Sequence, residues 1–302
     1  LAKNNQWLLI INIFTFPIAS TFYWLPRQLL ILSTDEKKYG QTGSLFAVLS
    51  RWSAVLGPIV GAMLVNTFHF GGLFEWGILF ILLSIVPLWL WEPDKLNWQF
   101  HFQNYWQKFE GRWFRKDLLA YVGYGLEETM FEYYWVVFLF INLSGSYLNL
   151  GSYKTALLIF SSLAAMFIGK YLDKHYKNHF MIIASAVISI LWILRGLILD
   201  KNILLGIDLT DSLAAIFLFI SFEFYAMHRN RHADAPLYTF ERETALNLGR
   251  VLAGVGVGTF YFLGLGWPWM VSLGIIGVIL MNFLPISPPQ SPSYSKRGML
   301  CL

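Results

Sequence analysis

The chain of 302 residues carries a net charge of +4, is 56% hydrophobic and 18% aromatic, and has only 13% charged residues. A water-soluble protein of this length cannot bury 26 Phe, 13 Trp and 15 Tyr behind so few charges, so the composition predicts an integral membrane protein. It argues against a soluble enzyme, a nucleic-acid-binding protein and, because Cys301 is the single cysteine, a disulfide-stabilised scaffold.

Nine apolar segments of membrane-spanning length follow one another along the chain. A helix needs about 20 residues to cross the hydrocarbon layer, and such segments occupy residues 7–25, 43–68, 72–91, 118–143, 153–172, 179–199, 211–227, 244–265 and 267–286. Stretches such as 77–91 are apolar on every side, which excludes the alternating pattern of a β-barrel. The predicted fold class is therefore an all-α, polytopic bundle with about nine transmembrane helices.

Basic residues are divided unequally between alternate sides of these segments. Sixteen Lys and Arg residues lie on one side, including Lys108 and Lys174, whereas only Lys3, Lys154 and Lys201 lie on the other. The positive-inside rule assigns the first side to the cytoplasm. We therefore expect a cytoplasmic C-terminus in a plasma membrane, such as the inner membrane of a bacterial cell.

A long connection divides the spans into two groups. Six aromatic residues recur at helical spacing between residues 92 and 117, which predicts a cytoplasmic amphipathic linker helix on the membrane surface, with an ordinary loop as the alternative. The predicted domains are three helices of an N-terminal bundle in 1–91, this linker in 92–117 and a C-terminal six-helix bundle in 118–286. The Ser- and Pro-rich tail, 287–302, is predicted to be disordered and cytoplasmic.

One motif suggests an internal repeat of six helices. The pattern R-x-x-A-x-x-G occurs twice, beginning at Arg51 and at Arg250, in spans that are six apart and run in the same direction. A G-P-x-x-G motif and a loop of the form G-x-x-x-D-K-x-x-K accompany it. Their residues are Gly57, Pro58 and Gly61 for the first, and Gly169, Asp173, Lys174 and Lys177 for the second.

On these motifs the sequence resembles the major facilitator superfamily. The resemblance implies a chain truncated at its N-terminus that covers helices four to twelve of a twelve-helix transporter. It also implies a gating role for the loop from Gly169 to Lys177, in which Asp173 would contact the cytoplasmic end of the second span. A solvated loop acid is the alternative for Asp173. For Arg51 and Arg250, a gate and a contact with lipid phosphate both remain open.

Acidic residues inside the fourth span are the strongest candidates for chemistry. Charged groups in the hydrocarbon region cost about 2.5–3.5 kcal/mol each on insertion scales, so each needs a reason. Tyr124, Glu128, Glu132 and Trp135 share one helical face, whereas Glu127 lies about 100° around the helix. We expect Glu128 or Glu132 to bind a polar substrate or a coupling proton. The alternative is a static interhelical pair with Arg51, Arg195 or Arg250.

The resemblance adds further candidates, because the fourth, seventh and tenth helices of the superfamily line its central cavity. At the matching positions of this chain they are Asn12, Tyr23 and Glu223.

The sequence thus predicts a secondary active transporter that moves a small solute by alternating access, as a symporter or antiporter driven by H⁺ or Na⁺. We expect a monomer in the lipid bilayer, with no cofactor, no metal and no nucleic-acid partner. No nucleotide loop, serine elbow or Cys/His ligand set is present, so no enzyme activity is expected. The alternatives are a polytopic enzyme acting on lipid or isoprenoid substrates, and a non-transporting sensor or assembly subunit.

Overall fold

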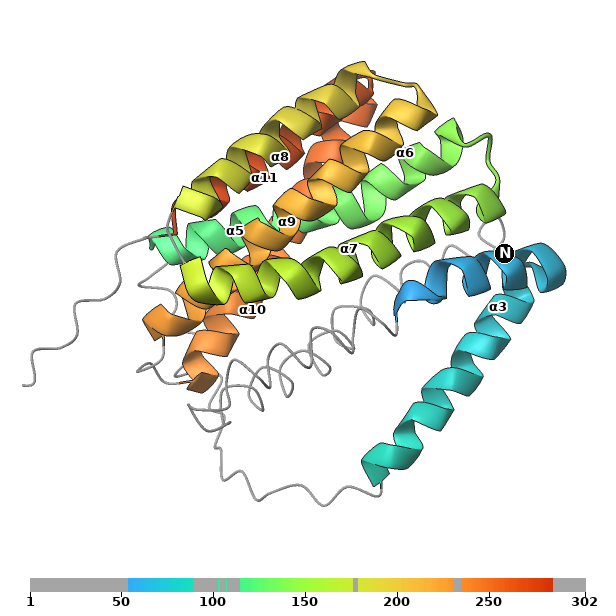
Figure 1. Cartoon of the computed structure of the whole chain (residues 1–302), viewed down its shortest axis with the longest axis horizontal. Coiled ribbons are helices and arrows are strands. Elements are labelled where there is room, and N and C mark those ends of the chain that lie inside the picture. The colour runs from blue at the N-terminus through green and yellow to red at the C-terminus, as the bar shows by residue number, and fades with distance from the viewer. Residues whose placement is uncertain are drawn as a thin grey trace, which may run out of the picture.

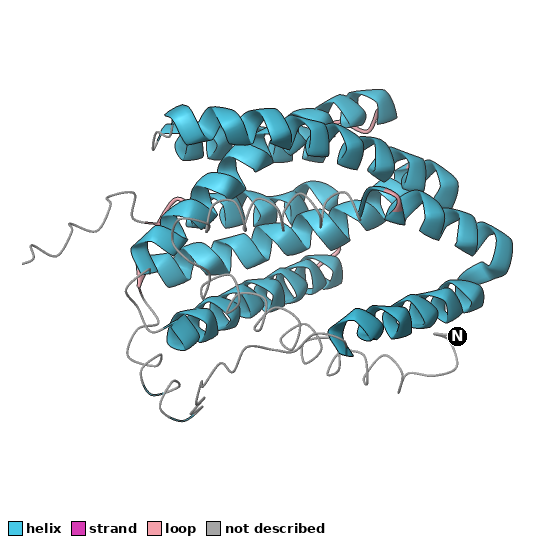
Figure 2. Cartoon of the chain, turned by 60° about the horizontal axis from the view of Figure 1, so that its bottom comes forward, coloured by secondary structure: helices cyan, strands magenta, loops and turns pink. Residues whose placement is uncertain are grey.

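The computed structural model describes residues 54–89, 115–175, 179–230 and 235–284, with the single positions 103 and 107. Throughout these ranges the ordered elements are helices, without a strand (Figure 2). They are α3 (Gly57–Trp89), α5 (Lys116–Thr129), the π-helix η1 (Met130–Tyr134), α6 (Trp135–Asn142), α7 (Tyr147–His175), α8 (His179–Leu197), α9 (Lys201–Asn230), α10 (Ala235–Phe262) and α11 (Trp267–Met281).

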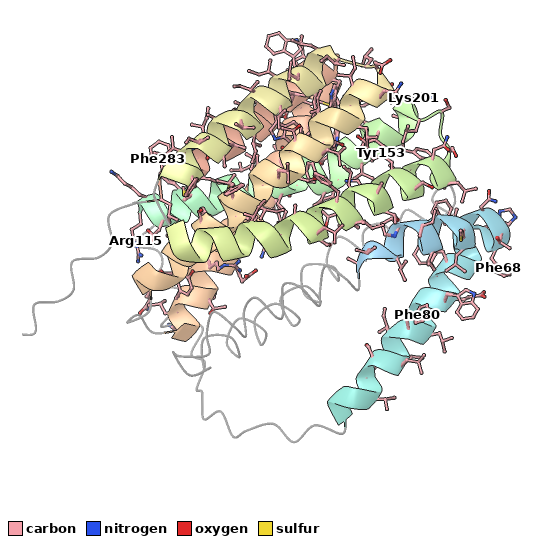
Figure 3. The ribbon with its side chains drawn as sticks, viewed as in Figure 1. Phe68, Phe80, Arg115, Tyr153, Lys201 and Phe283 are labelled. Atoms are coloured by element: carbon pink, nitrogen blue, oxygen red, sulfur yellow. The ribbon has the colours of Figure 1, made fainter. Side chains whose placement is uncertain are left out.

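The helices from α5 to α11 form an antiparallel bundle in which α5, η1 and α6 make one continuous rod (Figure 1). Helix α5 packs on α10 and α11, α8 packs on α9 and α11, and α7 packs on α3 and α9. Successive rods run in opposite directions, so Arg115 and Lys201 lie at opposite ends of the bundle (Figure 3). The sequence analysis assigned the linker 92–117, which contains Arg115, to the cytoplasmic side and Lys201 to the opposite side of the membrane.

Four helical segments are long and apolar enough to cross a membrane: Gly57–Val86, Phe180–Leu197, Lys201–Phe219 and Leu237–Phe262. Helix α11 is a shorter apolar helix. Large apolar side chains such as Ile183, Val251 and Phe262 point outward and are exposed, which suits contact with lipid. The prediction of an all-α membrane protein is confirmed for the described part of the chain. The count of nine spans stays a prediction.

The observed helices extend some predicted spans at their polar ends. The predicted span 118–143 matches the rod from α5 to α6, and 179–199 matches α8 within two residues. In contrast, α7 begins six residues before the predicted 153, α9 ten before 211 and α10 nine before 244. The added turns of α9 and α10 carry charged residues such as Asp208 and Glu241, and those of α7 carry polar residues such as Asn149, so the hydropathy criterion left these turns out of the spans.

Two predicted breaks have different outcomes. The spans 43–68 and 72–91 were separated by a short gap, and α3 is interrupted in that gap at His69, whose φ of 59° and ψ of −174° are not helical. The predicted loop beginning at Gly169 is instead helical as far as His175. In the sequence Lys170 and Asp173 are three residues apart, and opposite charges at this spacing favour a helix.

Several predictions concern segments outside the described residues. They are the first span, 7–25, the start of the second span as far as residue 53, nearly all of the linker 92–117 and the tail 287–302.

Glycines bring α5 and α10 into backbone contact. A Cβ atom added at Gly125 would lie 2.1 Å from the carbonyl oxygen of Leu246, and one added at Gly249 would lie 2.1 Å from that of Val122. Only glycine fits at such distances, because any side chain would separate the helices. These contacts fix the position of the helix that carries the acidic residues.

Candidate functional site

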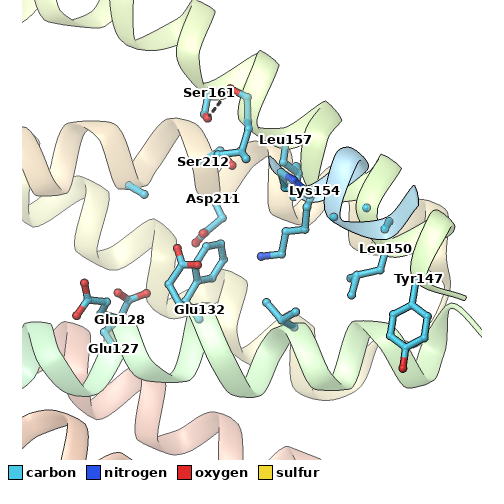
Figure 4. Close-up of a pocket in the computed structure, with 18 of the residues that line it drawn as sticks. Glu127, Glu128, Glu132, Tyr147, Leu150, Lys154, Leu157, Ser161, Asp211 and Ser212 are labelled. Carbon is cyan, nitrogen blue, oxygen red and sulfur yellow. Dashed lines mark hydrogen bonds between the residues drawn. The ribbon is translucent and has the colours of Figure 1, made fainter. Parts of the chain in front are cut away.

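A cavity of about 630 Å³ lies among α3, the rod from α5 to α6, α7 and α9 (Figure 4). Its walls are mainly apolar, with Val65, Phe70 and Leu157 among them. The polar side chains are grouped on α5, η1, α7 and α9. They are Tyr124, Glu127, Glu128, Glu132, Tyr147, Lys154, Ser161, Asp211 and Ser212. A few polar groups in a largely apolar pocket are typical of a small-molecule site.

The π-helix η1 determines which residues of this rod face the cavity. One additional residue in a turn rotates the following part of the helix by roughly 100°. Tyr124, Glu128 and Glu132 line the cavity as predicted, but Trp135 does not, since it follows the π turn. Glu127, which the ideal helix placed on a different face, also lines the cavity.

Glu128 has an ion-pair partner on the facing helix. Arg250 of α10 donates from Nε and Nη2 to Oε2 of Glu128, at 3.1 and 2.8 Å. The two side chains are 31% and 25% exposed, so the pair is hydrated in part. The structure therefore places Glu128 in an ion pair between two helices, which the sequence analysis gave as the alternative to binding a substrate or proton.

Glu127, Glu132 and Lys154 line the same cavity without such partners. No hydrogen bond or ion pair joins any of their side chains to another residue within the described ranges. Glu127 is only 4% exposed. Lys154 Nζ lies 4.8 Å from the centroid of the Phe131 ring, and its side chain extends from α7 toward the carboxylates of Glu132 and Asp211 (Figure 4).

Beside the cavity, Arg195 of α8 forms a fully buried ion pair with two acids of α9. Its Nε and Nη2 atoms donate to Oδ1 of Asp208 at 3.0 and 2.6 Å, and Nη2 lies 3.2 Å from Oδ2 of Asp211. Arg195 and Asp208 have no exposed side-chain surface. Close hydrogen bonds replace water around the Asp208 carboxylate and around Nε and Nη2 of Arg195, whereas Nη1 of Arg195 has no hydrogen-bond partner among the described residues.

Aromatic residues complete the surroundings of this pair. The other carboxylate oxygen of Asp208 accepts hydrogen bonds from Trp135 Nε1 at 2.9 Å and from the Tyr153 hydroxyl at 2.8 Å. The guanidinium carbon of Arg195 lies 5.1, 5.0 and 4.8 Å from the ring centroids of Phe131, Trp135 and Trp192. Trp135 therefore orders the ion pair and does not line the cavity.

Asp211 connects the buried ion pair to the cavity. One of its oxygens contacts Arg195, and the other has no hydrogen-bond partner among the described residues. Asp211 is also part of the cavity wall. A change in the charge of Asp211 therefore affects both the buried ion pair and the cavity.

A second polar cluster joins α5 and α10 at the end of the bundle that carries Arg115. Arg115 forms ion pairs with Asp117, and with Glu241 at 3.4 Å, and the Tyr121 and Tyr238 hydroxyls share a short hydrogen bond. The cluster ties the two helices together at the end predicted to be cytoplasmic.

The structure brings only part of the predicted site together. Pro58 and Gly61 line the cavity with the acidic residues, and Gly57 is the first residue of α3. Gly169, Asp173 and Lys174 lie in the last turns of α7, and Glu223 lies in α9, but their side chains are outside the described part. Other predicted residues lie wholly outside the described ranges: Asn12, Tyr23, Arg51 and Lys177.

The sequence analysis did not assign three charged residues to the cavity wall. Lys154 was counted as a loop residue, Asp211 was placed at the edge of a span, and Glu127 was placed on another face. The signal that could have identified Asp211 was Arg195, since an arginine within an apolar helix requires an acidic partner.

The described ranges contain no group of three or more His, Cys, Asp or Glu side chains that could hold a metal ion. No known protein family matches the sequence, and no curated protein matches it.

Proposed function

We propose that this protein is a secondary active transporter of the major facilitator type, which moves a small solute across a membrane by alternating access. The observation that carries the proposal is a cavity that contains unpaired charges and is lined in part by α3 and α9, two helices long and apolar enough to cross a membrane. Ionisable side chains within membrane-spanning helices are costly, and they commonly mark the path of a solute or ion.

The arrangement of α3 and α7 supports the proposal. The cavity lies between α3 on one side and the rod from α5 to α6, with α7 and α9, on the other. A Cβ atom added at Gly151 of α7 would lie 2.7 Å from the carbonyl oxygen of Pro58, so the G-P-x-x-G motif is a close helix contact beside the cavity. A carrier requires two groups of helices that meet at its binding site and can move against each other.

The same cavity offers sites for a coupling ion. Glu127 and Glu132 are carboxyl groups without a partner among the described residues, and they can take up a proton or Na⁺. We propose that a gradient of one of these ions drives transport in a plasma membrane, with the protein as a monomer and without a cofactor.

Thiol labelling of the cavity tests alternating access. In a Cys301→Ser background, the substitution Ser161→Cys places one thiol in the cavity wall. A membrane-impermeant maleimide should label it in both right-side-out and inverted vesicles. The controls are Lys201→Cys, at one end of the bundle, which should react from a single side, and Ile159→Cys, an exposed apolar position of α7, which lipid should protect. Labelling of Ser161→Cys from one side alone would contradict the proposal.

A further inference from the structure

We infer that the cavity binds an organic monocation, and that Lys154 holds the position of this cation when no solute is bound. The inference names the solute class of the proposed carrier and in that sense rests on the proposed function. Binding can nevertheless be measured without transport, so the two statements can fail separately.

Acidic groups outnumber basic groups around the cavity. The carboxylates of the cavity wall and of the adjoining ion pair are Glu127, Glu128, Glu132, Asp208 and Asp211. The cations beside them, among the described residues, are Lys154, Arg195 and Arg250. Five acids against three bases leave an excess of two negative charges when all are ionised. A cationic solute reduces that excess, whereas an anionic solute increases it.

The environment of Glu127 also favours a cation, independently of the number of acids and bases. Its side chain is 96% buried, as its exposed fraction is 4%, it belongs to the cavity wall, and it has no hydrogen bond or ion pair in the part of the chain described. A carboxylate buried without a partner is unfavourable by several kcal/mol, so the group is held neutral by a proton instead. An ammonium group that enters the cavity supplies a partner and favours the ionised form.

The apolar surface of the cavity suits an organic cation. Tyr124 and Phe219 form an aromatic pair with ring centroids 4.9 Å apart, and both line the cavity with Phe131. Aromatic faces attract ammonium groups within about 6 Å of the ring centroid. A volume of about 630 Å³ is large enough for a small organic cation. The described ranges contain no group of His, Cys, Asp or Glu side chains that could hold a metal ion instead.

The ammonium group of Lys154 already occupies a position beside an aromatic ring and two carboxylates of the cavity. Its Nζ atom lies 4.8 Å from the Phe131 centroid and extends toward Glu132 and Asp211, without an ion pair at contact distance to either (Figure 4). A lysine side chain is long and flexible, so it can withdraw when another cation arrives. Lys154 therefore competes with a cationic solute, whereas it would attract an anionic one.

The sign of the Lys154 effect is the test. We would measure binding of phenyltrimethylammonium to the purified full-length protein in lipid nanodiscs by equilibrium dialysis, with benzenesulfonate as the anionic probe. Lys154→Met should tighten binding of the cation by on the order of tenfold, because a repulsive charge is removed. Glu132→Gln should weaken it by about tenfold, since a charged contact is lost.

Matched controls address non-specific effects. Lys201→Met and Glu75→Gln remove the same charges at exposed positions away from the cavity and should leave the affinity unchanged. Thermal melting of each variant establishes that the protein is folded. Absent binding of the cation to the folded wild-type protein, tighter binding of benzenesulfonate than of the cation, or weaker cation binding in Lys154→Met would each overturn the inference.

Transport measurements separate this inference from the proposed function. If phenyltrimethylammonium binds with the expected dependence on Lys154 but is never carried across a membrane, the result supports the cation site and contradicts the proposed transport of this solute class. If the protein carries a neutral or anionic solute and does not bind the cation, the result supports the proposed function and contradicts the inference of a cation site.

Discussion

Replacement of Arg195 by methionine should destabilise the bundle more than any other single charge removal in the described part of the chain. Methionine keeps an unbranched side chain of moderate length but leaves the carboxylates of Asp208 and Asp211 without their cation. Asp208 then loses two of its four hydrogen bonds, those from Nε and Nη2 at 3.0 and 2.6 Å. It retains only the bonds from Trp135 and Tyr153.

The magnitude follows from burial. Hydrogen bonds to charged groups contribute about 1.5–3 kcal/mol each, and loss of one partner from a buried ion pair costs about 3–5 kcal/mol. For a protein of this size a loss of 1 kcal/mol lowers the melting temperature by about 2–4 °C. We therefore expect Arg195→Met to melt about 6–20 °C below the wild-type protein.

The assay is thermal unfolding in detergent, followed by size-exclusion chromatography after heating. Arg250→Met is the matched control, because its ion pair with Glu128 is partly exposed and its loss should cost about 1 kcal/mol or less. Adding Asp208→Asn to Arg195→Met should recover part of the loss, since one uncompensated charge is removed. Equal melting temperatures for Arg195→Met and Arg250→Met would refute this reasoning.

Three further predictions concern packing, the aromatic shell and the cavity pair. Gly249→Ala should lower the free energy of unfolding by about 1–3 kcal/mol, because its Cβ would clash with the Val122 carbonyl oxygen. Gly258→Ala, which has open space around it, should be neutral or stabilising. Equal melting temperatures for the two variants would contradict the close contact. Trp135→Phe should cost about 1–3 kcal/mol in melting experiments through the lost donor to Asp208, and Trp269→Phe, at an exposed position, should cost much less; a neutral Trp135→Phe would exclude this role. Glu128→Arg and Arg250→Glu should each reduce solute uptake by vesicles, and their combination should restore part of it; no recovery in the double variant would count against a functional pair.

Hydrophobic segments predicted the bounds of some helices well. The predicted span 179–199 corresponds to α8, and 118–143 corresponds to the rod from Lys116 to Asn142. The beginning of α9 was misplaced by ten residues, because Asp208 and Asp211 interrupt the apolar run. Their charges are compensated by Arg195 from another helix, and such a tertiary contact leaves no mark on a local hydropathy pattern.

The sequence correctly placed three residues of the candidate site on one face of a helix, because ideal helix geometry holds over that stretch. Tyr124, Glu128 and Glu132 face one cavity, as a period of 3.6 residues indicates. The π turn at Met130–Tyr134 then changes the register and moves Trp135 to the buried ion pair. A register change of this kind depends on packing against neighbouring helices, so the sequence pattern alone did not predict it.

Solute counterflow tests the central claim most directly, because it distinguishes a carrier from a receptor, an enzyme or a channel. Proteoliposomes loaded with unlabelled phenyltrimethylammonium would be diluted into a trace of the labelled cation. The account predicts transient accumulation of label above equilibrium in the wild-type protein and in Glu75→Gln, and a strongly reduced overshoot in Glu132→Gln. The absence of an overshoot in wild-type protein that binds the cation would contradict a carrier mechanism.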